Sequence, residues 1–321
     1  MTNFQVYRKT LSFSLVMFLV GLGGLAVLGG FTVLGFVITN QPPLENGVVG
    51  AIIGFILGCI GAALINLFIT NRFKAAQIAM MTRGVTEGNL PDKGTFKEGL
   101  NEMKGKFGKI TVFFFITNAI KSLFKQIGRG VTGAATAIGG QTGNTVGNVI
   151  DSAVQTLIGY LCDCCLGWIL YRKDQNAFRS GCEGAVIFFK HGKTMIRNVG
   201  RIFGMGILSF LVIGGAFFGL SYLIFSQFPD MANQLAAEIS SWSEEPSPIF
   251  ENGTVFTIAA SIIVGVLMWS LLHSVLIRPF ILTGVLRNYM AAGQADLPTE
   301  KDMQEMNSKF PRFGKLYNKV Q

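Results

Sequence analysis

The stretch that decides the fold is residues 45–72, which read ENGVVGAIIGFILGCIGAALINLFITNR. Between Glu45 and Arg72 it carries no charge, and it is long enough for a membrane span, which needs about 20 apolar residues as helix. Residues 251–278 read ENGTVFTIAASIIVGVLMWSLLHSVLIR and have the same residue types at both ends, with the same interval. The match predicts an internal repeat containing two spans of equal length.

Composition places the whole chain in the membrane class. Half of the 321 residues are hydrophobic, only 14% are charged, and the mean hydropathy is +0.47. A soluble chain has about 25% charged residues, so much of this surface is expected to meet lipid. The net charge of +9 is concentrated in particular loops. It therefore predicts membrane orientation and contact with anionic lipid headgroups, and no nucleic-acid partner.

Further apolar stretches extend the pattern along the chain. Strong candidates for spans lie within 12–38 and 202–229, and weaker ones at 107–127 and 150–171. The predicted fold is all-α: a polytopic integral membrane protein with about six transmembrane helices, arranged as three hairpins with cytoplasmic amphipathic arms. A rival interpretation makes the two middle segments re-entrant.

Three sections follow from this layout. Residues 1–106 form the first hairpin and a basic arm. Residues 107–201 form a middle hairpin with a glycine-rich outer loop and a basic amphipathic arm, expected to lie at the membrane surface. Residues 202–321 form the third hairpin, its arm and a polar tail.

The distribution of basic residues predicts the orientation. Of the 27 lysines and arginines, 24 fall before the first span or in the three predicted arms. Loop 230–251 contains five acids and no base. By the positive-inside rule the arms and both termini are cytoplasmic, in a multi-pass protein of the cell membrane.

Two ionisable residues are candidates for an intramembrane site. Asp163 lies within predicted span 150–171, and His273 lies five residues before Arg278. A carboxylate in lipid costs about 2.5–3.5 kcal/mol on the insertion scale and usually faces a cavity or a partner. Asp163 is thus interpreted as a cation or proton site, as an acid hydrogen-bonded between helices, or as a residue that precedes a span beginning later than 150.

The basic arms are candidates for binding lipid headgroups. Each basic residue near an anionic surface contributes about 1 kcal/mol of attraction. The alternative is that these residues only orient and anchor the chain. The headgroup candidates are Arg72, Arg172, Lys190, Lys193, Arg197 and Arg278.

The regularly spaced glycines and the cysteines are interpreted mainly as structural residues. Gly50, Gly54 and Gly58 recur every fourth residue and predict close helix packing, a pore-lining groove, or contact with a second copy or a membrane partner. Five cysteines, Cys59, Cys162, Cys164, Cys165 and Cys182, lack the paired spacing of a zinc site. They are expected to be reduced thiols, and no metal or cofactor is predicted.

No sequence motif of a hydrolase or nucleotide-binding enzyme is present, so the chain is not expected to be an enzyme. Short matches in residues 160–300 resemble the C-terminal part of choline transporter-like membrane proteins. They are Cys164-Cys165, Asn176-Ala177-Phe178, Arg197-Asn198 with Arg201, Ser274-Val275, Leu286, Gly293 and Pro298. The resemblance implies a multi-pass protein with a transport role and carries no binding residues.

Two functions follow from these observations. The first is a transporter or channel-like protein for a small solute, ion or lipid, supported by Asp163, the glycine faces and the resemblance. The second is a non-catalytic membrane scaffold or assembly subunit that binds acidic lipid or a partner through its basic arms.

Overall fold

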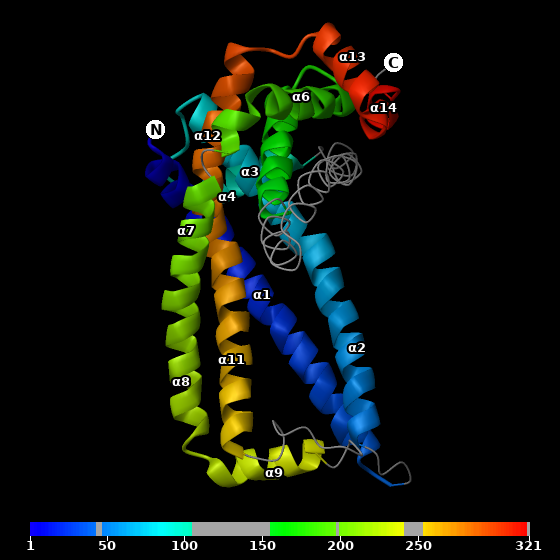
Figure 1. Cartoon of the computed structure of the whole chain (residues 1–321), viewed down its shortest axis with the longest axis vertical. Helices are drawn as coiled ribbons and strands as arrows, with labels where there is room; N and C mark the ends of the chain where they lie inside the picture. The colour runs from blue at the N-terminus through cyan, green and yellow to red at the C-terminus, as the bar shows by residue number, and fades with distance from the viewer. Residues whose placement is uncertain (43–46, 105–154, 197–198, 241–252, 320–321) are drawn as a thin grey trace, which may run out of the picture. The chain divides into compact units, whose positions relative to one another are not determined.

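The structure is a computed structural model that describes residues 1–42, 47–104, 155–196, 199–240 and 253–319. Helices are the regular elements of these residues (Figure 1). Four helical stretches are long and apolar enough to cross a membrane: Asn3–Thr39, Val49–Thr86, Gly204–Phe225 and Gly253–Ala295. They coincide with the four strong predictions, so an all-helical chain with four candidate spans is confirmed. Predicted span 107–127 lies outside the described residues.

The chain divides into two compact units, which differ from the three predicted sections because packing joins segments far apart in sequence. Unit 1 contains Met1–Val199 and Pro279–Gln321, and unit 2 contains Gly200–Arg278. The helices of unit 1 are α1 (Asn3–Thr39), α2 (Gly47–Ile65), the π-helical turn η1 (Asn66–Thr70), α3 (Asn71–Thr86), α4 (Thr95–Met103), a helix at 155–171, α6 (Ala177–Ile196), α12 (Arg278–Ala295), α13 (Glu300–Lys309) and α14 (Pro311–Tyr317).

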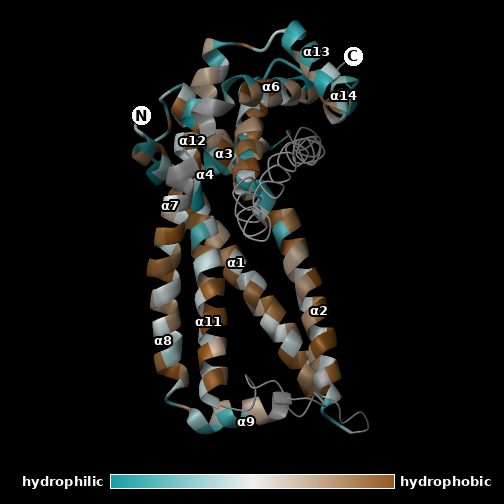
Figure 2. Cartoon of the chain, viewed as in Figure 1, coloured by the Kyte–Doolittle hydropathy of each residue, from teal (hydrophilic) through white to brown (hydrophobic). Residues whose placement is uncertain are grey.

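In unit 1, α1 and α2 form a hairpin in which glycines bring the two backbones together. A methyl group on Gly54 would overlap the Phe31 carbonyl, one on Gly50 would overlap the Gly35 carbonyl, and one on Gly58 would lie 2.8 Å from the Leu28 Cα. The predicted glycine face is therefore filled by α1 of the same chain. The exposed side chains of α2, and of α1 beyond residue 17, include many large hydrophobic ones. The ribbons of both helices are accordingly brown and pale over most of this length (Figure 2).

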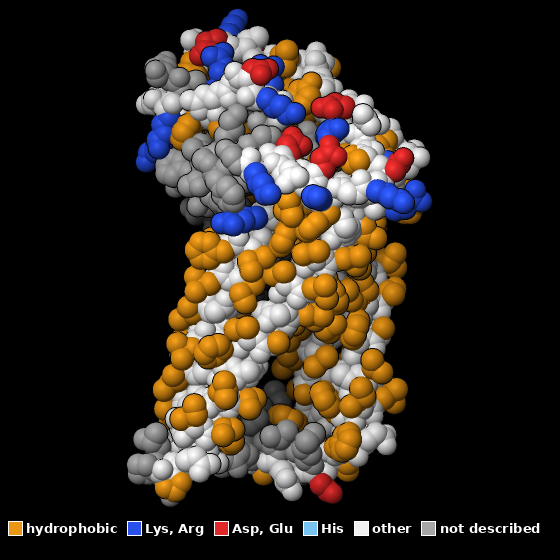
Figure 3. All heavy atoms as spheres, turned by 180° about the vertical axis from the view of Figure 1, so that it is seen from behind, with side chains coloured by type: hydrophobic (Ala, Val, Ile, Leu, Met, Phe, Trp, Pro, Cys, Tyr) orange, Lys and Arg blue, Asp and Glu red, His pale blue; other side chains and the backbone are white. Residues whose placement is uncertain are grey.

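The remaining helices of unit 1 form a second body, which we call the helical cap. It consists of residues 3–17 of α1, together with α3, α4, 155–171, α6, α12 from Pro279, α13 and α14. Its largest fully buried side chains include Phe13, Met80, Trp168, Tyr289 and Phe313, which come from five different helices. Charged side chains gather on the cap, whereas hydrophobic ones cover the long helices (Figure 3).

Helix 155–171 lies at the centre of the cap. Every residue from 158 to 170 except Gly159 is buried, and Gly167 is closely enclosed by neighbours. A methyl group on Gly167 would meet Thr82 of α3 at 2.7 Å and Leu286 of α12 at 2.8 Å. From α6, Glu183 accepts a hydrogen bond from Trp168. This helix is thus surrounded by protein.

The arm of the second section differs from the prediction of an amphipathic helix at the membrane surface. On α6 the apolar residues Cys182, Ala185, Val186 and Ile187 are buried within the cap, as is the α3 stretch from Ala75 to Thr82. An amphipathic pattern requires only an apolar partner on one face, and here that partner is protein.

Unit 2 is a second hairpin. It contains α7 (Val199–Ser209), the π-helical turn η2 (Phe210–Gly214), α8 (Gly215–Phe225), α9 (Pro229–Ser240), α11 (Gly253–Leu272) and the π-helical turn η3 (His273–Ile277). Helix α11 packs against η2, α8 and α9. The acidic stretch expected as a loop at 230–251 begins as helix α9, because the residues after Pro229 include good helix formers.

Candidate functional site

Asp163 is buried inside the cap, where a lysine satisfies it. The Lys74 Nζ of α3 lies 2.6 Å from Asp163 Oδ1, and only 5% of the Asp163 side chain is exposed against 33% for Lys74. A buried carboxylate without such a partner would carry a large desolvation cost. The amine occupies the position that a bound cation would take, which favours the structural interpretation of Asp163.

Glu183 organises a second buried polar group, which involves the predicted headgroup residue Arg172. Its carboxylate accepts hydrogen bonds from Trp168 Nε1 at 3.0 Å and from Gln175 Nε2 at 2.7 Å. Arg172 Nε lies 3.4 Å from the same oxygen, Oε2. Glu183 is only 3% exposed. Its contacts hold the turn between 155–171 and α6 in place, and its negative charge balances the positive charge of Arg172.

Lys190 is likewise paired within the cap. Its Nζ lies 2.9 Å from Asp296 Oδ2 and 3.3 Å from Asp302 Oδ2, which joins α6 to the end of α12 and the start of α13. The hydrogen bond to Asp296 raises the pKa of Lys190. Hydrogen bonds from the Thr299 backbone and hydroxyl, then from Lys190, lower the pKa of Asp302.

The other headgroup candidates have different positions. Arg72 is exposed at the beginning of α3, just after η1, and Arg278 is half-buried just after η3. The side chain of Lys193 and the whole of Arg197 lie outside what the structure describes. The lipid-headgroup role thus stays a prediction, and its best-placed residue is Arg72.

The cysteines of the cap are buried thiols. Burial raises the pKa of Cys165 and of Cys182 to about 12, and it also raises the pKa of Cys164 well above the ordinary thiol value. Since the thiolate is the reactive form, such thiols are poor nucleophiles and poor metal ligands at neutral pH. Within the described part of the chain, no group of three or more His, Cys, Asp or Glu residues could hold a metal ion.

His273 belongs to a polar cluster in unit 2, which we call the Ser-His cluster. Its Nδ1 lies 3.1 Å from Ser209 Oγ, and the same oxygen accepts a hydrogen bond from Trp269 Nε1 at 3.2 Å. Ser209 also donates to the Gly206 carbonyl at 2.8 Å. Because a hydroxyl has one proton, His273 then donates through Nδ1–H to Ser209, which leaves Nε2 as the acceptor.

The Ser-His cluster lies where both helices of the hairpin depart from α-helical geometry. Ser209 directly precedes η2, and His273 is the first residue of η3. Single π-turns inside α-helices are frequently found at functional sites. Sequence reasoning identified His273 but not Ser209 or Trp269, because their contacts connect residues 60 and 64 positions apart.

Comparisons of the chain with protein-family models, with curated proteins and with solved structures give no match. The resemblance to choline transporter-like proteins stays a prediction. The evidence for function is therefore the paired charges of the cap, the Ser-His cluster and the apolar hairpins.

Proposed function

We propose that the chain is a non-catalytic membrane scaffold: a four-span anchor that holds the helical cap at the basic face of the membrane. Four spans are preferred to six because 155–171, the described second leg of the predicted middle hairpin, is enclosed by protein. With an even number of spans, both termini lie on the same side, and the basic residues of the cap favour the cytoplasm for that side.

One observation carries this proposal: the charged groups of the cap, which include the buried carboxylates Asp163 and Glu183, are used to hold its helices together. Asp163 joins 155–171 to α3, Glu183 joins it to α6, and Lys190 joins α6 to α12 and α13. A catalytic or transport site needs groups that remain available to a ligand. A rigid cap with internally paired charges instead suits a surface for assembly.

The scaffold proposal is tested by photo-crosslinking in the native membrane. A photoreactive amino acid would be placed at Lys315, exposed on α14, and at Ile52, exposed on α2. The proposal expects a discrete protein adduct from position 315 and lipid adducts alone from position 52. If position 315 and a second exposed cap position, Lys97 of α4, both give no protein adduct, the proposal is wrong.

A transport role is the second candidate, and the Ser-His cluster is the observation that favours it. A histidine hydrogen-bonded to a hydroxyl inside a candidate span can bind and release a proton. Proton flux would be measured in vesicles with wild-type protein and with His273→Phe. Flux above that of protein-free vesicles, lost in the variant, would support transport. Flux equal to that of empty vesicles for both proteins would favour the scaffold.

A further inference from the structure

Helix α6 is kinked at His191, whose φ of −114° and ψ of 16° are not helical. Before the kink, residues 185–187 are buried in the cap and anchor the first part of the helix. After the kink, α6 ends at Ile196 and α7 begins at Val199, where the chain passes from unit 1 to unit 2. The conformation at His191 therefore affects the segment by which the chain leaves the cap.

Four ionisable side chains meet at this kink, and we call them the His191 cluster: Lys190, His191, Asp296 and Asp302. Asp296 directly follows α12, and Asp302 lies in the first turn of α13. Lys190 Nζ lies 2.9 Å from Asp296 Oδ2 and 3.3 Å from Asp302 Oδ2. His191 Nε2 lies 3.3 Å from the same oxygen of Asp296. Figure 1 shows α6 running below the connection from α12 to α13, which the cluster ties to the helix.

The environment of His191 Nε2 calls for a proton on this nitrogen. Within the described part of the chain, Nε2 is buried and makes no hydrogen bond, although the Asp296 carboxylate is so near. An ionised carboxylate accepts hydrogen bonds and donates none, so a favourable contact requires an N–H at Nε2. A neutral imidazole can place its one proton there, whereas an imidazolium has a proton on both nitrogens and adds a positive charge.

The charges of the His191 cluster balance when the imidazole is protonated. With a neutral His191, one lysine faces two aspartates, which leaves an excess of one negative charge. Hydrogen bonds raise the pKa of Lys190 and lower the pKa of Asp302, so both stay charged between about pH 5 and 8. Histidine is the side chain that ordinarily changes its charge in this range.

We propose that His191 is a pH-sensitive latch of the cap: the imidazolium pairs with Asp296 and holds the kinked part of α6 to the end of α12. In mildly acid solution the latch is closed. At higher pH the neutral ring leaves the excess negative charge, and the contact weakens. The latch goes beyond the scaffold role, and crosslinking from positions 315 and 97 does not depend on it, so either idea can fail alone.

The proposal is tested by hydrogen exchange of the full chain in detergent at about pH 5.5 and about pH 7.5, either side of the ordinary histidine range. Rates are divided by the intrinsic rate at each pH, and peptides are resolved by mass spectrometry. In the wild type, the amides of residues 188–193 should exchange roughly threefold more slowly at the lower pH, the effect of one partly exposed ion pair. In His191→Gln the amide can still donate a hydrogen bond but gains no charge, so its exchange should equal the wild-type value at the higher pH and stay there.

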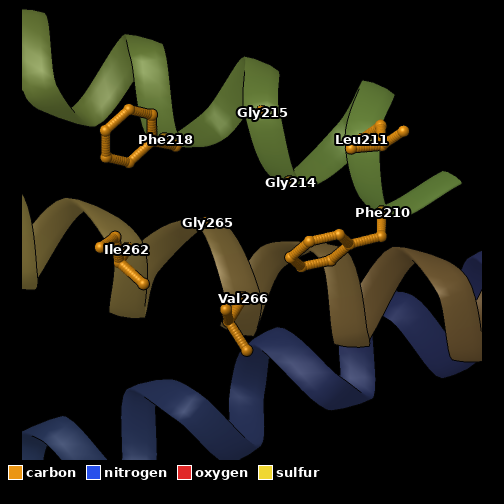
Figure 4. A pocket seen from close by; sticks show the side chains of 8 residues that line it. All are labelled: Phe210, Leu211, Gly214, Gly215, Phe218, Ile262, Gly265 and Val266. Carbon is orange, nitrogen blue, oxygen red and sulfur yellow. The ribbon is translucent and has the colours of Figure 1, made fainter. Parts of the chain in front are cut away.

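The matched control is His273→Gln, which removes the only other histidine of the chain. His273 contacts Ser209, which Trp269 also contacts, and Trp269 packs against Phe210. Phe210 lines a groove of unit 2 whose side chains are apolar (Figure 4). A histidine in such surroundings has no carboxylate to pair with, so His273→Gln should keep the response at residues 188–193.

Asp296→Asn tests the partner and replaces His191→Gln if that variant does not fold. It removes the negative charge that the imidazolium faces, so most of the pH response at residues 188–193 should disappear. The proposal is wrong if wild-type exchange is the same at both pH values, or if Asp296→Asn keeps the full response. It is also wrong if slower exchange at the lower pH extends equally over every helix of the cap.

Discussion

Two apolar helices of unit 1, α2 and 155–171, have opposite surroundings. On α2, the side chains of Ile52, Ile53 and Ile56 are each more than half exposed, and packing is restricted to the glycine face against α1. On 155–171, Trp168 and Leu161 are completely buried. Figure 2 shows α2 in brown with pale bands, whereas the cap around 155–171 also contains teal, hydrophilic segments.

The difference teaches that hydropathy alone cannot separate a lipid-facing helix from one buried in protein. Both avoid water, and both contain glycines where neighbours approach. The distinguishing feature is a polar residue with a partner: Asp163 lies on 155–171 and pairs with Lys74, whereas α2 carries no ionisable group except Cys59. Substitutions in one helix or the other, compared for their effects on stability, test this difference in surroundings.

The largest loss of stability is expected when a large side chain is removed from the core of the cap. Trp168→Ala removes a fully buried ring and its hydrogen bond to Glu183, at a cost of about 3–5 kcal/mol. Phe55→Ala removes a half-exposed ring from α2 and should cost less than about 1 kcal/mol, because its surroundings are expected to be lipid. Thermal unfolding in one detergent, followed by circular dichroism, measures both. Similar losses would show that the two helices have similar surroundings.

The next effect concerns the glycine face of α2. Gly54→Leu places a side chain against the Phe31 carbonyl and should separate α1 from α2, with a loss of about 3 kcal/mol. The control is Gly29→Leu on α1, where an added methyl group has no atom within 4 Å. Thermal unfolding and disulfide crosslinking between cysteines introduced on the facing helices report the separation. A Gly54→Leu protein as stable as Gly29→Leu would refute this packing.

A smaller effect is expected at the ion pair of the cap. Asp163→Asn leaves Lys74 without its carboxylate and should cost about 2 kcal/mol, less than for a fully buried pair because a third of the lysine is exposed. Lys74→Gln and the double variant complete a double-mutant cycle. A coupling energy near zero would mean that the pair does not hold 155–171 to α3.

The smallest effect is a pH dependence of the contact between α6 and α13. The pKa of Lys190 is raised by Asp296, so its contribution is complete below the ordinary lysine value of 10.5 and is lost as pH rises through the folded pKa. The pKa of Asp302 is lowered, so its contribution is present above 3.8 and is lost as pH falls through the folded pKa. Since these groups are partly exposed, each loss should be less than about 1 kcal/mol.

The measurement is the unfolding midpoint against pH, with Lys190→Gln as the comparison. The wild type should lose its advantage over the variant above pH 10.5 and at strongly acid pH. A difference between the two proteins that stays constant over the whole pH range would contradict the assignment.

The strong spans were predictable because their signal is local. Predicted span 254–277 coincides with α11 and η3, and the stretch before Arg72 coincides with α2 and η1. One π-helical turn, at 66–70, ends two residues before Arg72, and another, at 273–277, ends directly before Arg278. The internal repeat stays a prediction. No residue pattern predicts such a turn, since it depends on how neighbouring helices meet.

The cap and the sites were less predictable. The sequence alone shows that the Asp163 carboxylate would be costly to place in lipid. Its partner Lys74 lies 89 positions earlier, however, and only the fold brings the two together. The Ser-His cluster was not predictable either, because it connects Ser209 and His273, which lie 64 positions apart. Amphipathic patterns on α3 and α6 predict an apolar face, but such a pattern does not reveal whether lipid or protein covers that face.

The central claim, that 155–171 lies in a protein cap whereas the unit 2 hairpin lies in lipid, is tested most directly by tryptophan quenching. Vesicles would contain phospholipids brominated on their acyl chains. Trp242→Phe keeps Trp168 of the cap and Trp269 of α11, and adding Trp269→Phe leaves Trp168 alone. We predict that emission is partly quenched in the first protein and unquenched in the second. Strong quenching of Trp168 alone would place helix 155–171 in the bilayer and contradict the account.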